Sequence, residues 1–110
     1  MRRLGWNIMV KIEELPSADN DVTNIASYIS NELFNEDAAL KFWDNYFTKT
    51  IDLNPFPRKY TAYEPFKLLK QEYRRFMIGN YIVFYTVTED NLVTIARVLH
   101  ERQDTDNVLT

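Results

Sequence analysis

The sequence contains no cysteine, and this absence excludes three kinds of chemistry. Without a thiol the chain cannot form disulfides, attack a substrate through a thiolate or bind a metal through sulfur. It also contains a single histidine, His100, which excludes a metal site built from several imidazoles and an acid/base pair of two histidines. We therefore expect neither a metal nor a cofactor.

Glycine and proline are also scarce, with two and four copies in 110 residues, so the chain offers little flexible linker. Its apolar runs are far shorter than the roughly 18 residues of a membrane span, and no signal-peptide core follows the N-terminal arginines. Hydrophobic residues still make up 45% of the chain and aromatic residues 15%, which is enough for a packed core. These features predict one soluble, cytoplasmic domain over residues 1–110 that does not contact membranes.

The net charge of −3 hides an uneven distribution of charge along the chain. Residues 13–52 contain nine acidic and two basic side chains, whereas residues 58–75 contain six basic and two acidic ones. An acidic half and a basic surface indicate a partner that binds the basic side. The alternative is that both are solvated faces without a partner.

Hydrophobic periodicity predicts a strand and then a helix at the N-terminal end. Alternating apolar residues predict a strand over residues 7–13 that ends at Pro16, and Ser17 is a candidate helix cap. Apolar residues at spacings of three and four then predict a helix over residues 18–34. Asp19 and Asp21 in its first turn suit the positive end of the helix dipole.

A second helix is predicted after Asn35, and the Asn54–Pro57 segment ends it because proline lacks an amide hydrogen. The short connection predicts an antiparallel helical hairpin. The buried side of the second helix is expected to carry Ala39, Phe42, Trp43, Tyr46, Phe47 and Ile51.

After a basic loop over residues 58–69, three strands are predicted over residues 71–78, 81–87 and 92–100. Gly79–Asn80 fits a type II′ turn, which pairs Ile78 with Tyr81, Arg74 with Tyr85 and Arg75 with Phe84. The tail over residues 101–110 either frays or forms a short helix. The predicted fold class is α+β, with the order β-α-α-β-β-β: an N-terminal strand and a helical hairpin packed on a mainly antiparallel sheet.

A four-residue loop between the last two strands predicts that Val87 pairs with Leu92 and Tyr85 with Thr94. This register places His100 on the face of Arg74 and Tyr85, and Arg97 on the face of Arg75.

The last two strands also carry a family resemblance. Residues 80–87 read Asn-Tyr-Ile-Val-Phe-Tyr-Thr-Val, and residues 95–104 read Ile-Ala-Arg-Val-Leu-His-Glu-Arg-Gln-Asp. With Asp37-Ala-Ala39, the Pro-Phe-Pro after the second helix and the Arg-Arg-Phe before the turn, these segments resemble the RelE/ParE superfamily of bacterial type II toxins. The resemblance implies a RelE/ParE-like fold and a plasmid-stabilisation toxin that inhibits growth and is neutralised by a cognate antitoxin.

The superfamily has two activities: RelE-like members cut messenger RNA on the ribosome, and ParE-like members block DNA gyrase. If the protein is a metal-independent nuclease, its candidate catalytic residues are Arg75, Arg97, His100 and Arg102, with Arg74 and Tyr85 as further candidates. A histidine or tyrosine would move protons and the arginines would hold the phosphate. Each also has a structural interpretation, such as an ion pair for Arg97. A shared pocket for His100, Arg74, Arg97 and Arg102 would favour the nuclease.

Three features favour the ParE-like activity. RelE-like nucleases carry an arginine directly after the aromatic residue that opens the strand following the hairpin, and this chain has Ile82 there. The preceding strand has Tyr73 and Arg75 where such nucleases tend to have two basic residues, and a chain at −3 attracts ribosomal RNA weakly. We therefore expect a gyrase-binding toxin. The ribosome-dependent nuclease is the alternative, and an inactive antitoxin-binding relative is a third possibility.

The second helix carries more aromatic residues than packing against one sheet requires, which indicates an exposed apolar side. We expect at least one of Trp43, Tyr46 and Phe47 to contact the antitoxin. An acidic part of the antitoxin is expected to meet the basic surface, mainly increasing the association rate.

Overall fold

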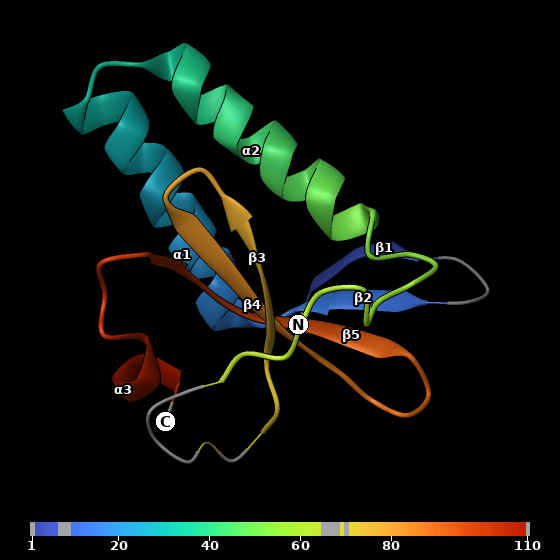
Figure 1. Cartoon of the computed structure of the whole chain (residues 1–110). Coiled ribbons are helices and arrows are strands. Elements are labelled where there is room, and N and C mark those ends of the chain that lie inside the picture. Colours follow the sequence, from blue (N-terminus) through green and yellow to red (C-terminus); the bar gives the residue numbers. More distant parts are fainter. Residues whose placement is uncertain (1, 7–9, 65–68, 70, 110) are drawn as a thin grey trace.

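The computed structural model consists of a five-stranded sheet with a helical hairpin on one face and a short C-terminal helix on the other (Figure 1). The structure describes residues 2–6, 10–64, 69 and 71–109. Its elements are β1 (Arg2–Trp6), β2 (Lys11–Glu14), α1 (Pro16–Ser27), the π-helical segment η1 (Tyr28–Glu32), α2 (Glu36–Ile51), β3 (Arg74–Ile78), β4 (Tyr81–Val87), β5 (Leu92–His100) and α3 (Thr105–Leu109).

The strand order is β1-β2-β5-β4-β3, and among the described strands only β2 and β5 pair in parallel. The predicted α+β class and the order β-α-α-β-β-β are confirmed, with β1 and α3 in addition.

The first predicted strand lies further along the chain than expected, and another strand precedes it. β2 covers Lys11–Glu14, while residues 7–9 of the predicted strand lie outside the described residues. β1 pairs antiparallel with β2, with a shift in register between Arg3 and Gly5. The β1 sequence Arg-Arg-Leu-Gly-Trp has no clear two-residue alternation, so pairing with β2 rather than local preference explains this strand.

Pro16 begins α1, and Ser17 does not cap it as the sequence predicts. The N-cap is Leu15, which makes no side-chain capping bond, and proline suits the first helical position because its amide needs no partner there. The Ser17 hydroxyl instead donates to the carbonyl of Ala96 at 3.0 Å. Since β2 pairs with β5 only as far as Ile95, this bond helps α1 to cover the remaining edge of β5.

The helical hairpin forms as predicted, although its first helix changes geometry before it ends. α1 continues into η1, whose π-helical turns contain more residues than α-helical turns. The apolar side chains that follow therefore no longer point to the same side as those of α1. Leu33, which the α-helical periodicity places on the buried side, is consequently 56% exposed. α2 begins after Asn35, whose side chain accepts a hydrogen bond from the Ala38 amide at 3.0 Å.

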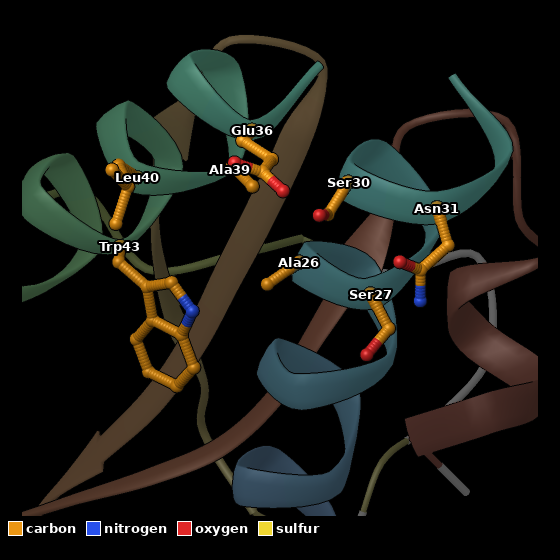
Figure 2. Close-up of a pocket in the computed structure, with 8 residues that line it drawn as sticks. All are labelled: Ala26, Ser27, Ser30, Asn31, Glu36, Ala39, Leu40 and Trp43. Atoms are coloured by element: carbon orange, nitrogen blue, oxygen red, sulfur yellow. The ribbon is translucent and has the colours of Figure 1, made fainter. Parts of the chain in front are cut away.

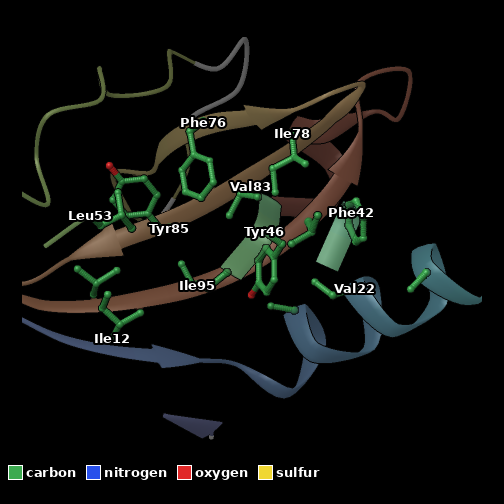
Figure 3. Packing of buried hydrophobic residues seen from close by; sticks show 14 of the residues in the cluster. Ile12, Val22, Phe42, Tyr46, Leu53, Phe76, Ile78, Val83, Tyr85 and Ile95 are labelled. Atoms are coloured by element: carbon green, nitrogen blue, oxygen red, sulfur yellow. The ribbon is translucent and has the colours of Figure 1, made fainter. Parts of the chain in front are cut away.

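The main core lies between the hairpin and the sheet (Figure 3). Its buried side chains come from both helices and from strands β2 to β5, and they include Ile12, Val22, Phe42, Tyr46, Phe76, Val83, Tyr85 and Ile95. On α2 the buried residues are Ala39, Phe42, Tyr46 and Thr50. The prediction was wrong for Phe47 and Ile51, which are 40% and 44% exposed. Each lies one residue, or about 100° of rotation, beyond a buried one.

The register between β3 and β4 follows the sequence prediction. Ile78 pairs with Tyr81, Arg74 with Tyr85 and Arg75 with Phe84. Gly79 has a φ of +56°. Type II′ turns have a positive φ at this first central position, which glycine adopts at little cost.

The predicted register between β4 and β5 was wrong near their loop. Val87 pairs with Val93, and Tyr85 pairs with Ile95. A register shift between Phe84 and Tyr85 then changes the pairing once more, so that Arg97 pairs with Phe84 and His100 with Tyr81. His100 and Arg97 therefore lie on their predicted faces, although their partners differ.

The second face of the sheet has its own smaller cluster, to which α3 contributes Leu109. The other buried members are Tyr73, Ile82, Phe84, Ala96 and Leu99. Within the described parts of the chain, no helix is long and apolar enough to cross a membrane.

Candidate functional site

Arg97, one of the predicted catalytic residues, is bound by Asp21 of α1. Its Nε donates to Oδ2 at 2.6 Å and its Nη2 to Oδ1 at 2.8 Å, and the Val98 amide donates to the same carboxylate at 2.9 Å. The hydrogen bond to Asp21 raises the pKa of Arg97. This two-pronged geometry is the one by which arginine binds a phosphate, so Asp21 occupies that part of the guanidinium.

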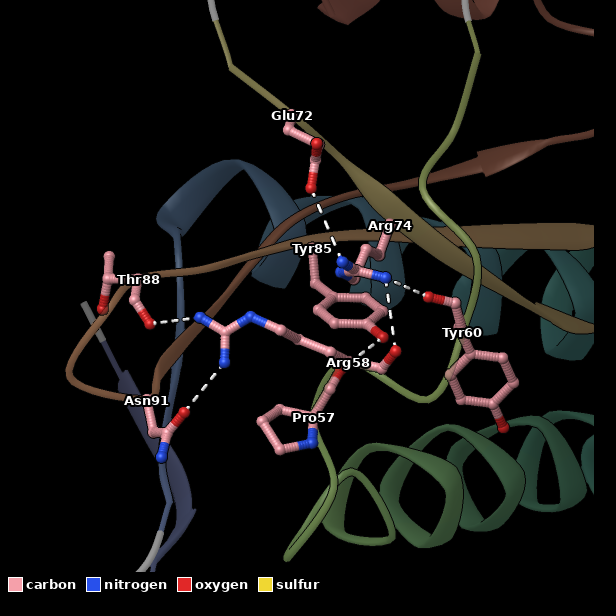
Figure 4. Close-up of polar contacts among 8 residues, drawn as sticks. All are labelled: Pro57, Arg58, Tyr60, Glu72, Arg74, Tyr85, Thr88 and Asn91. Atoms are coloured by element: carbon pink, nitrogen blue, oxygen red, sulfur yellow. Dashed lines mark hydrogen bonds and ion pairs between the residues drawn. The ribbon is translucent and has the colours of Figure 1, made fainter.

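Arg74 and Tyr85 are paired across β3 and β4, and both bind the loop that follows α2 (Figure 4). The Tyr85 hydroxyl donates to the Pro57 carbonyl at 2.8 Å, while Nη1 of Arg74 donates to the carbonyls of Tyr60 at 2.5 Å and Arg58 at 3.3 Å. Burial raises the pKa of Tyr85 to about 12, so at neutral pH this hydroxyl is not a ready base. Both side chains hold the loop.

Arg75 lies on the opposite face of the sheet, where its guanidinium stacks over the Tyr63 ring at 5.0 Å from the centroid. It lines a pocket of about 470 Å³, and the lining also includes four carboxylates, those of Glu64, Glu101, Asp104 and Asp106. The Tyr63 hydroxyl donates to Asp106, and burial together with this bond raises the pKa of Tyr63 to about 12. Carboxylates around Arg75 disfavour a phosphate there.

His100 ends β5 on the face that carries the hairpin. Its Nδ1 accepts a hydrogen bond from the Arg102 amide at 3.1 Å, and its amide donates to Oε1 of Gln103 at 2.7 Å. The imidazole packs edge to face against Tyr81, with 5.2 Å between centroids, and Tyr81 packs in the same way against Phe42 of α2. The Arg102 side chain is exposed beyond the strand.

The four nuclease candidates are thus engaged in different places. Arg97 binds Asp21, Arg75 stacks on Tyr63 on the second face, and His100 packs on Tyr81 with Arg102 beside it along the chain. The structure brings His100 and Arg102 together but places the other two arginines elsewhere.

A second surface follows the outer side of α2, and we call it the α2 outer stripe. It consists of Leu40, Trp43, Phe47 and Ile51, each one residue after a member of the buried stripe. Leu40 is 63% exposed and Trp43 is half-buried. These residues recur at spacings of three and four, so they form one continuous apolar line along the helix.

A groove of about 360 Å³ runs between the first half of this stripe and the wall formed by the end of α1 and by η1 (Figure 2). Leu40 and Trp43 line it from α2, and the indole of Trp43 extends toward α1. The opposite wall is made of small and polar residues, Ala26, Ser27, Ser30 and Asn31, with Glu36 near the hairpin tip.

Tyr46, one of the three residues of which at least one is expected to contact the antitoxin, does not belong to this surface. Its side chain is fully buried, and its hydroxyl donates to the carboxylate of Glu14, which is also fully buried. Tyr46 faces the sheet, whereas the helical rotation leaves Phe47 40% exposed and Trp43 half-buried, packed against the main core. Trp43 and Phe47 remain accessible.

The sequence matches, over residues 12–105, the family described as the ParE toxin of the type II toxin-antitoxin system, parDE. The chain belongs to the ParE toxin family. A search of curated protein sequences gives no match.

Solved structures also resemble this ParE-family chain. One, titled as the chromosomal ParDE system of P. aeruginosa, has a TM-score of 0.66 at 16% identity, and the match covers 84% of this chain and 96% of that one. Another, an archaeal RelE-RelB complex from Pyrococcus horikoshii OT3, has a TM-score of 0.52 at 13% identity and covers 87% and 99% of the two chains. At these identities the similarity shows the shared RelE/ParE fold.

Sequence reasoning missed the partner of Arg97 in this ParE-family chain. Asp21 was expected to serve the helix dipole, yet it directly precedes Val22 on the buried side of α1. An acidic residue beside a buried stripe and an arginine in an apolar strand each need a partner. Because each of these two residues needs a partner of opposite charge, Asp21 and Arg97 could have been matched from the sequence. The exposure of Leu40 and Ile51 was not predicted, because the same spacing of three and four residues describes both the buried stripe and the outer stripe.

Proposed function

We propose that this protein is a cytoplasmic, single-domain toxin of a type II toxin-antitoxin pair that inhibits growth by binding DNA gyrase. It performs no bond-breaking chemistry of its own. Membership of the ParE toxin family supports the toxin role. The observation that carries the choice of binding over catalysis is the ion pair between Arg97 and Asp21.

Metal-independent cleavage of RNA needs a base for the 2′-hydroxyl, a cation at the phosphate and an acid for the leaving oxygen, all within reach of one phosphate. Here Asp21 engages Arg97, and Arg75 lies among carboxylates on the face opposite His100. Arg102 lies beside His100, but one imidazole and one exposed arginine supply fewer groups than the reaction uses. This arrangement supports a binding protein.

The proposal includes a cognate antitoxin that covers the α2 outer stripe. Accessible apolar side chains along about three turns of one helix form a larger patch than scattered surface residues do, and such patches mark interaction sites. Trp43 and Phe47 are the aromatic members, and aromatic residues commonly carry most of the energy of an interface. An antitoxin segment that lies along α2 would cover both and fill the groove beside Trp43.

The deciding experiment measures DNA supercoiling by purified gyrase at increasing concentrations of the protein, beside a translation reaction with ribosomes and a defined message. We expect supercoiling to fall and the message to remain intact. Unaffected supercoiling with discrete cuts in ribosome-bound message would instead establish the RelE-like nuclease. Normal growth after induction without antitoxin would identify an inactive relative that retains only antitoxin binding.

A further inference from the structure

The loop after α2 carries an exposed aromatic ring. Phe56 is 71% exposed, whereas Leu53 and Pro57 on either side of it are buried. The Lys59 amide donates to the Phe56 carbonyl at 3.2 Å and closes a turn at this point. A single exposed apolar residue is common on protein surfaces. What distinguishes Phe56 is the set of contacts that hold the backbone beside it.

Three parts of the fold fix the base of the loop (Figure 4). From β4, the Tyr85 hydroxyl binds the Pro57 carbonyl, and from β3, Arg74 binds the carbonyl of Arg58. Arg58 in turn reaches the loop between β4 and β5, where Nη2 donates to the Thr88 carbonyl at 2.8 Å and Nη1 to Oδ1 of Asn91 at 3.0 Å. The backbone beneath Phe56 is therefore set in place when the protein folds.

The same contacts determine how the positive charges of the loop can act. Lys59 forms an ion pair with Asp52 at 2.5 Å, which neutralises it. Arg58 donates to uncharged oxygens, so these hydrogen bonds do not cancel its charge, whereas Glu72 lies 3.6 Å from Arg74 and offsets part of the charge of that guanidinium. Donors already used by the chain itself are less available for a two-pronged phosphate contact, while the field of the charges still extends into solvent.

We propose that residues 55–59 form a docking knob and that Phe56 inserts into an apolar pocket with an acidic rim on the protein that this toxin inhibits. The inference rests on the proposed function, since it names the surface that reaches the target. A protein partner is favoured over a nucleic acid because the terminal nitrogens of Arg58 already donate to Thr88 and Asn91.

Binding energy at protein interfaces concentrates in a few anchors, and aromatic residues are prominent among them. An anchor on a loop that is already ordered loses less conformational entropy on binding than one on a mobile loop. The positive field of Arg58 complements an acidic rim and speeds encounter.

The test compares Phe56→Ala with Phe34→Ala, a matched control at the hairpin tip, where Phe34 is 89% exposed. Both full-length variants are induced without antitoxin to score growth arrest, then purified to measure thermal unfolding and inhibition of gyrase supercoiling. We expect Phe56→Ala to melt like the unchanged protein but to need at least about 30-fold more protein for half-inhibition, as for an interface anchor. Phe34→Ala keeps full potency, and Phe56→Trp keeps most of it.

The outcomes separate the inference from the function on which it rests. If the unchanged protein inhibits gyrase and Phe56→Ala does so equally well, the docking knob is refuted and the proposed function stands. If the unchanged protein leaves gyrase active but arrests growth, the choice of gyrase fails. In that case, equal arrest by Phe56→Ala would also refute the knob, whereas loss of arrest would support it for another target. An unchanged protein without effect on growth or gyrase refutes both.

Discussion

Asp21 and Arg97 lie 76 residues apart in the chain and are joined by two hydrogen bonds between their charged side chains. The Val98 amide adds a third bond to the same carboxylate. The carboxylate therefore holds α1 along the part of β5 that β2 does not reach. It accepts hydrogen bonds both from the arginine side chain and from a backbone amide at the edge of the strand.

Removing this carboxylate by Asp21→Ala should lower the free energy of unfolding by about 2 kcal/mol, because it leaves a half-buried guanidinium and an edge amide without their partner. Urea denaturation measures the change. Asp37→Ala in the exposed first turn of α2 is the control and should cost less than about 1 kcal/mol, the usual value of a helix-dipole contact. Equal losses in the two variants would contradict the structural role of Asp21.

The contrast between Tyr46 and Phe47 predicts opposite effects of two neighbouring substitutions. Tyr46→Phe should destabilise the protein by about 1–3 kcal/mol, because it withdraws a donor from the buried Glu14 carboxylate, and should leave antitoxin affinity unchanged. Phe47→Ala should barely alter stability but should weaken antitoxin binding about tenfold or more. Denaturation and titration calorimetry of both variants distinguish these outcomes. A loss of affinity confined to Tyr46→Phe would refute the assignment of the outer stripe.

Tyr85, which is buried, and Tyr63, which is partly buried, predict a loss of stability in alkali. The pKa of Tyr63 and of Tyr85 rises from the ordinary 10.0 to about 12 in the folded protein, with burial as the largest cause. Between these values the unfolded chain releases the protons first, so the free energy of unfolding falls as pH rises from about 10 to about 12 and is unaffected below. Denaturation at a series of alkaline pH values measures this slope. The slope of unfolding free energy against pH should be shallower in a Tyr63→Phe, Tyr85→Phe double variant than in the unchanged protein. An equal slope in the two proteins would contradict the prediction.

Gly79→Ala isolates the backbone cost of the turn between β3 and β4. A Cβ at this position would meet no atom within 4 Å, so the positive φ of +56° is the main source of any penalty. We expect a loss of about 1 kcal/mol, visible as a lower melting temperature. A stabilised variant would show that the turn does not need glycine.

Elements marked by local signals were predictable from the sequence. α2 lies between Asn35, whose side chain accepts from a first-turn amide, and a proline-containing segment, and the β3–β4 hairpin turns at a glycine with positive φ. β1 carried no such signal. The register of β5 was misjudged at the loop, where Val87 pairs with Val93 rather than Leu92, and it changes again at a bulge between Phe84 and Tyr85 that no local signal marks.

For the candidate site, sequence reasoning selected the arginines and the aromatic residues of α2 but not their surroundings. Whether Trp43, Tyr46 or Phe47 faces the sheet depends on a rotation of about 100° per residue, which a cluster of six aromatic and aliphatic residues does not define. The tertiary arrangement separates them into a core residue and an outer stripe.

By itself the sequence determined the α+β order of elements, the helical hairpin and the β3–β4 turn, because periodicity, prolines and glycines act on neighbouring residues. Only the tertiary structure decided which charges have partners within the chain and which apolar side chains remain exposed. The physical reason is distance: an electrostatic contact such as Asp21–Arg97 depends on separation in space, and a separation of 76 positions along the chain carries no direct record of it.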